Sequence, residues 1–117
     1  MGKEFMKIGI DYNDLLLRIN NNETIALKFL KKFIEDQTMM LIKEDYKSQD
    51  YEQLLKDVHS LKGISANLSM KKLFTITSCW VSDLRAEKYQ TSEELYQQCL
   101  EEHTKIILGL KKIFNDE

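Results

Sequence analysis

A histidine, a lysine and a glycine stand close together in the stretch VHSLKGISANLS, residues 58–69. Histidine offers a neutral nitrogen nucleophile near neutral pH, and His59 is followed by a cation at Lys62. Gly63 removes a side chain one helical turn beyond His59, which leaves room for an approaching group. A nitrogen nucleophile, a cation and a clearing suit phosphoryl transfer to nitrogen. An ordinary surface histidine is the alternative that this spacing alone leaves open.

These three residues need a helix that turns them toward solvent. The apolar residues around them repeat at spacings of three and four, which predicts a helix over residues 51–67. At about 100° per residue, His59 lies about 100° from Val58, in the middle of the apolar stripe. Gly63 lies at about 140° and Lys62 at about 40° on the same scale. We therefore expect an accessible imidazole, a clearing on its C-terminal side, and a lysine between the imidazole and the core.

The rest of the chain also has the pattern of helices, since it contains no proline and four glycines. The further predicted helices are 10–19, 23–46, 70–87 and a last one that begins at Thr91 or Ser92. In the segment 23–46, which Gln37 interrupts, the expected apolar stripe is Ala26, Phe29, Leu30, Phe33, Ile34, Met40 and Leu41. Long amphipathic helices with short loops pack as antiparallel neighbours. We predict an all-α fold, an up-down-up-down four-helix bundle with a short N-terminal capping helix.

Length and composition limit the functions that the chain can have. Its 117 residues fit one domain, which we assign to residues 10–117, with an N-terminal segment at 1–9. Residues 1–5 precede a second methionine and are either a leader or native sequence. The net charge of −2 provides no basic surface for nucleic acid. No apolar run approaches the roughly 18 residues of a membrane span, so we expect no membrane partner.

The remaining reactive side chains favour structural roles. Cys79 and Cys99 have neither metal-site nor disulfide-framework spacing, so we expect free thiols and a cytoplasmic location. His103 lacks the Lys-Gly context and a second histidine at a metal-binding spacing, so we expect no metal site. Met39 and Met40 fit the core, with an adaptable docking patch as the alternative.

The stretch HSLKGISANLS resembles the signature of histidine-containing phosphotransfer (HPt) domains of two-component phosphorelays. That signature is His-x-Leu-Lys-Gly, then small residues, then a Leu-Gly step into the next helix. The matching residues here are His59, Leu61, Lys62, Gly63, Ser65, Asn67 and Leu68. The resemblance covers residues 10–87 and includes LLLRINNNETIALKFLKKFIED and KSQDYEQLLKDVHSLKG. The last helix is similar only in its apolar spacing.

The resemblance implies a histidine phosphocarrier in a His-Asp phosphorelay, and hence a phosphoprotein. His59 would accept the phosphoryl group on Nε2, Lys62 would balance its charge, and Gly63 would supply clearance. Such domains are not enzymes on their own and need no cofactor. The partner, a response-regulator receiver domain or a hybrid sensor histidine kinase, would bring the aspartate and the Mg²⁺. The resemblance also places the docking face on the flanks of the second and third helices, with Ile10, Leu15, Phe33, Ser65 and Ala66 as candidates.

Two residues depart from the family pattern. Ser69 stands where the family usually has glycine, and we expect it to cap the following helix. Val81 stands where many members have a glutamate or glutamine that bonds the imidazole. The imidazole would then be oriented by packing, by water, or by Ser78 or Ser82. These departures support an alternative function, an HPt-like binding module that docks a receiver or kinase domain without phosphotransfer.

Overall fold

The structure is a computed structural model that describes residues 2–115. Its helices, in chain order, are α1 (Gly2–Lys7), α2 (Tyr12–Arg18), α3 (Glu23–Ile34), α4 (Thr38–Ser48), α5 (Tyr51–Asn67), α6 (Lys71–Arg85) and α7 (Ser92–Asn115). The described part of the chain contains no strand, which confirms the predicted all-α class. No helix in that part is long and apolar enough to cross a bilayer.

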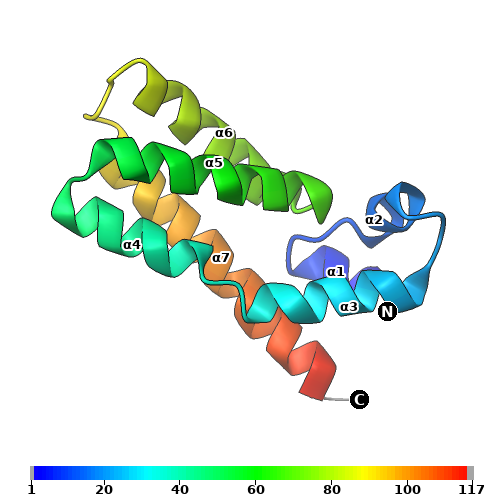
Figure 1. The fold of residues 1–117 in the computed structure, drawn as a ribbon. Helices are drawn as coiled ribbons and strands as arrows, with labels where there is room; N and C mark the ends of the chain where they lie inside the picture. The colour runs from blue at the N-terminus through cyan, green and yellow to red at the C-terminus, as the bar shows by residue number, and fades with distance from the viewer. Residues whose placement is uncertain (1, 116–117) are drawn as a thin grey trace.

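Four helices form the body of the molecule, as predicted. Figure 1 shows α5 and α6 running side by side, with α4 along α5 and α7 passing behind them. Each of these helices packs on its neighbours in the bundle, and α7 continues beyond them to contact α3 and α1. The molecule is elongated, with principal extents of 42 × 25 × 19 Å. The predicted antiparallel bundle is therefore confirmed, and α7 is shared by both of its ends.

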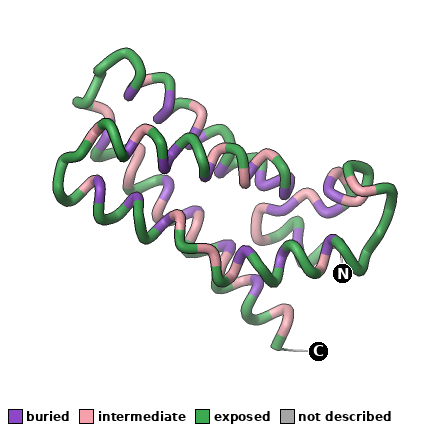
Figure 2. Tube along the Cα trace, viewed as in Figure 1, coloured by how far each residue is buried: buried purple, intermediate pink, exposed green. Residues whose placement is uncertain are grey.

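The core is made of the apolar stripes that turn toward one another between these helices (Figure 2). Trp80 lies in its centre, fully buried, and its Nε1 donates a hydrogen bond to Ser92 Oγ at 3.1 Å. The buried positions on α5, α6 and α7 include Leu54, Val58, Leu61, Leu73, Ile76, Leu84, Cys99, Ile106 and Leu110. These positions recur at the spacings of three and four that are typical of an amphipathic helix.

The prediction of one helix over 23–46 is wrong, because the chain breaks into α3 and α4 at residues 35–37. Gln37 is the N-cap of α4, and Asp36 before it accepts a hydrogen bond on Oδ1 from the Thr38 amide at 2.9 Å. The break also changes which apolar residues face inward. Met40 and Leu41, predicted in the stripe, are exposed, as is Phe29 on α3. The apolar residues of α4 that are buried are instead Met39 and Ile42.

Residues N-terminal to the predicted domain boundary pack against the rest of the described chain, and the boundary at residue 10 stays a prediction. Phe5 of α1 is fully buried. Its ring stacks on Tyr12 with centroids 4.8 Å apart and lies 6.3 Å from Phe114 of α7. The predicted capping helix is present as α2, but it begins after Ile10, at Tyr12.

Candidate functional site

His59 lies on the solvent-exposed face of α5. The helix begins at Asp50, whose side chain accepts a hydrogen bond from the Gln53 amide at 3.2 Å, as expected for an N-cap. Val58 is fully buried while His59 is exposed, so α5 has the rotation that the apolar spacing predicted. Within residues 2–115 the imidazole makes no hydrogen bond and no ion pair. It is therefore open to an approaching partner.

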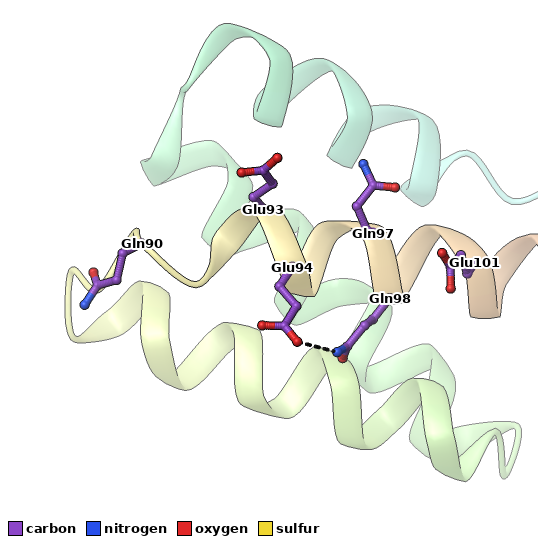
Figure 3. Close-up of a pocket in the computed structure, with 6 residues that line it drawn as sticks. All are labelled: Gln90, Glu93, Glu94, Gln97, Gln98 and Glu101. Carbon is purple, nitrogen blue, oxygen red and sulfur yellow. Dashed lines mark hydrogen bonds between the residues drawn. The ribbon is translucent and has the colours of Figure 1, made fainter.

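The histidine site is a surface and not a pocket. The hollow drawn in Figure 3 runs along α7 and is lined by glutamate and glutamine side chains. Gln98 Nε2 donates to Glu94 Oε1 there at 3.3 Å, so these groups partly satisfy one another. His59 is not among the residues that line this hollow. A reaction at His59 must accordingly take its enclosure from whatever docks on α5.

The clearing beside His59 is real. A Cβ built at Gly63 would meet no atom within 4 Å, apart from the backbone of its own helix. Gly63 has a helical backbone in the middle of α5, so no turn or left-handed φ requires glycine at this position. Glycine weakens a helix interior by about 1 kcal/mol relative to alanine. Folding therefore does not explain this glycine, and an open surface next to His59 is what it provides.

Lys62 is directed to the neighbouring helix. Its Nζ lies 6.0 Å from the centroid of the Phe74 ring of α6. In the part of the chain that the structure describes, Lys62 has no carboxylate partner. The ammonium is thus available to an incoming anion, one turn along α5 from His59.

The residues considered for orienting the imidazole make no hydrogen bond to it. Val81 is only 1% exposed and belongs to the core. Ser82 is exposed, and Ser78 is partly buried on α6. The Ser78 Oγ is shielded from solvent yet has no hydrogen-bond partner among the described residues. The Ser78 hydroxyl is therefore a buried polar group of α6 without a hydrogen bond among the described residues.

Ser69 does not cap α6, which corrects the role expected for it. Met70 occupies the N-cap position and makes no side-chain hydrogen bond. Ser69 adopts a left-handed φ of 56°, a conformation that favours glycine. Its Oγ donates instead to Asp14 Oδ2 at 2.7 Å.

This bond joins α2 to the corner between α5 and α6. The Ser69 carbonyl accepts from the Asp11 amide at 3.0 Å, and Lys71 Nζ lies 3.0 Å from Asp11 Oδ2. The Ser69 hydrogen bond, aided by Arg18, lowers the pKa of the Asp14 carboxyl. The Ser69 hydroxyl thus adds one side-chain contact to those that hold α2 at this corner.

Most of the predicted docking residues are in the core, and the prediction is corrected for these. Ile10, Leu15 and Ser65 are fully buried and Phe33 nearly so, which leaves little of their side chains for a partner to contact. The Ser65 Oγ bonds the Leu61 carbonyl at 2.7 Å. Ala66 is partly exposed, and its docking role stays a prediction.

Exposed apolar side chains near the corner were missed. They are Leu17 on α2 and Phe74 on α6. Three successive leucines occupy 15–17, and their order alone does not say which one faces solvent. Phe74 follows Leu73, which is buried, and it lies outside the inward stripe of α6. A large apolar residue outside the stripe was the sequence signal that could have identified it.

The other histidine is in a different environment. The His103 ring meets Phe33 edge-on, with centroids 5.5 Å apart. Burial lowers the pKa of His103, with a further contribution from the charge of Lys43. No group of three or more metal-ligating side chains occurs within the described residues. Cys79 is an exposed free thiol and Cys99 a buried one, and burial raises the pKa of Cys99 to about 12.

A solved structure resembles this chain over almost its whole length. It is the HPt domain from the Hpt sensor hybrid histidine kinase from Shewanella. The two structures superpose with a TM-score of 0.83 over 94% of this chain and 97% of the other. The chain has the HPt fold. The sequence identity is 19%, so the likeness establishes the fold and not the chemistry. No protein-family model matches the sequence, and no curated protein matches it significantly.

Proposed function

We propose that the chain is a histidine phosphocarrier of a His-Asp phosphorelay. It would accept a phosphoryl group on His59 from the aspartate of a receiver domain and donate it to another. The observation that carries the proposal is the pairing of His59 with an open position at Gly63, on the exposed face of α5 in an HPt fold. The packing of the fold explains neither the exposed imidazole of His59 nor the missing side chain at Gly63.

The transfer balances without a cofactor in this chain. The lone pair of the neutral His59 Nε2 attacks the phosphorus of an aspartyl phosphate. The N–P bond forms while the P–O bond breaks, and the aspartate leaves as a carboxylate with the electron pair. The imidazole keeps its other proton on Nδ1 and carries the positive charge. Lys62 lies one turn away and balances the charge of the bound group, while the receiver supplies Mg²⁺ and the aspartate.

A binding module that docks a receiver or kinase domain without transfer is the second candidate. It is favoured by the buried Val81, which removes a side chain able to bond the imidazole. It is also favoured by the absence of any hydrogen bond to His59 within residues 2–115. In this function the face of α5 would still dock a receiver, but His59 itself would be dispensable.

The decisive experiment compares the wild type with His59→Gln and His103→Gln. Each protein is incubated with a small phosphoramidate donor, and separately with a phosphorylated receiver domain. Intact mass is measured before and after mild acid, because a phosphoramidate bond to histidine is acid-labile. We expect one acid-labile phosphoryl group on the wild type and on His103→Gln, and none on His59→Gln. His59 is exposed, so His59→Gln should keep the wild-type melting temperature.

The same set of proteins separates the two candidates. Equal receiver affinity for the wild type and His59→Gln, with no phosphoryl gain on either, would support the binding module and reject the carrier. Phosphorylation that persists in His59→Gln but is lost in His103→Gln would show that His103, and not His59, accepts the phosphoryl group.

A further inference from the structure

Phe74 has an unusual position for a large apolar residue of α6. Leu73, Ile76, Trp80 and Leu84 of the same helix are all buried, whereas Phe74 is 37% exposed. Because Phe74 is partly exposed, part of its ring is accessible to another contact. The contact that the structure gives it is the ammonium of Lys62 on α5.

The ring lies against the strip of α5 that carries the site. Phe74 lines a groove together with Ser65 and Ala66 of α5, and with Asp14 and Arg18 of α2. The ring thus stands at the edge of the α5 surface, beside the residues that follow Gly63. Lys62 Nζ lies 6.0 Å from its centroid, at the outer limit of a cation–π contact.

Lys62 has little else to hold it. No carboxylate pairs with it within the described part of the chain. A lysine side chain has four rotatable bonds and loses considerable rotamer freedom when its ammonium is fixed in one place. A ring that keeps the ammonium on the α6 side of the strip removes part of this loss before the phosphoryl group arrives.

We propose that Phe74 is a positioning residue for Lys62, and through Lys62 for the phosphoryl group on His59. The role in transfer rests on the proposed function, whereas the contact itself does not. The π face of the Phe74 ring holds the Lys62 ammonium in one position while His59 is unmodified. The ammonium keeps its contact with the ring when the phosphoryl group is bound, so Lys62 meets the group from a position that is already ordered. Phe74 would in this way help to order the site, in which Val81 cannot form a hydrogen bond to the imidazole.

The test uses Phe74→Leu, which keeps an apolar side chain but removes the ring, and Phe74→Tyr, which keeps the ring. Phe29→Leu is the matched control, because Phe29 is an exposed phenylalanine on α3, 42% accessible. In the unmodified protein, the NMR shifts of the Lys62 side-chain methylene protons report the ring current of Phe74. We expect these shifts to move toward random-coil values in Phe74→Leu only. We expect phosphoryl transfer to His59 to slow about 2- to 5-fold in Phe74→Leu only.

A double variant separates positioning from general damage. In a Lys62→Met background, Phe74→Leu should have no further effect on the transfer rate, because the partner of the ring is already gone. An equal slowing in both backgrounds, or unchanged Lys62 shifts in Phe74→Leu, would overturn the proposal. If His59 of the wild type takes up no phosphoryl group, the proposed function fails, and the Lys62 shifts alone then decide whether the contact exists.

Discussion

The opening beside the imidazole depends on one missing side chain, that of Gly63. Because a Cβ at this position would meet no atom within 4 Å, Gly63→Ala should stabilise α5 by about 0.5–1 kcal/mol. Gly63→Gln should leave the free energy of unfolding close to that of the wild type. Its longer side chain would occupy the clearing and slow transfer to His59 by about 10- to 100-fold. Urea denaturation and transfer rates measure the two effects separately.

Wild-type transfer by Gly63→Gln would refute the role of the clearing. A large loss of stability in Gly63→Ala would show instead that the position is crowded, contrary to the geometry.

Single-helix periodicity was enough to predict the exposure of His59 and Gly63, because both depend on the rotation of α5 alone. The contact of Lys62 with Phe74 could not be predicted in the same way. It depends on the register of α5 against α6, which the pattern of neither helix contains. For a related reason the sequence could not show that Leu15, a docking candidate, is buried while Leu17 is exposed. A run of three leucines fits more than one rotation of a short helix.

At the scale of elements, the corner formed by Ser69 attaches α2 to the bundle. Ser69→Ala would lose the hydrogen bond to Asp14 and keep the left-handed φ, so we expect a loss of about 2 kcal/mol of stability. Ser69→Gly would lose the same bond but relieve the backbone strain of about 1 kcal/mol. Glycine should therefore be less destabilising than alanine at this position.

Urea denaturation of the two variants measures this order. Ser60→Ala is the matched control, since Ser60 is exposed on α5 and bonds only the carbonyl of Lys56 within the described chain. An alanine variant as stable as the glycine variant would mean that φ at residue 69 relaxes without cost.

The break between α3 and α4 is the element that the sequence did not reveal. Ala26, Leu30 and Phe33 define a helical phase that continues through Met40 and Leu41. Met39 and Ile42 define a second phase that is equally apolar, and no glycine or proline marks the change. Periodicity cannot choose between the two phases. The hydrogen bond that Asp36 accepts from the Thr38 amide is a local contact at this break that periodicity does not contain.

At the scale of the whole molecule, a pair of carboxylates couples stability to pH. Asp45 of α4 and Asp57 of α5 are each 9% exposed, and Gln53 Nε2 donates to Asp57 Oδ2 at 3.3 Å. Burial, with the hydrogen bond and the charge of Asp57, raises the pKa of Asp45 to about 7. In the unfolded chain this carboxyl ionises near its ordinary pKa of about 4. The folded state therefore binds the proton more tightly, and its contribution to stability is lost as the pH rises through about 7.

We expect the ionisation of Asp45 to lower the free energy of unfolding by about 1–2 kcal/mol between pH 6 and 8, an effect that the lowered pKa of His103 partly offsets in the wild type. Asp45→Asn, which cannot ionise, should abolish most of this fall and be more stable than the wild type at pH 8. Glu52→Gln is the control, because Glu52 is an exposed acid on α5 and does not contribute to the raised pKa of Asp45. Urea denaturation across this range checks the prediction. A wild-type slope retained in Asp45→Asn would exclude the pair as its source.

The arrangement of the whole molecule was largely predictable. The lack of proline, the long amphipathic segments and the short loops predicted an antiparallel helical bundle. The burial of Phe5 was not predictable, because α1 is short and its contact with Phe114 comes from a distant part of the chain. Short segments contain too few residues for their apolar spacing to be decisive.

The joint at residues 35–37 has a consequence for how this chain tolerates change. It divides the long arm into two rods, of which α4 supports the helix that bears His59 and α3 supports the N-terminal helices. Because residues 35–37 are not helical, an insertion there would lengthen the joint and leave the inward faces of α3 and α4 unchanged. Chain length can accordingly vary at this joint during evolution, and the N-terminal third can be remodelled while the surface around the histidine is preserved.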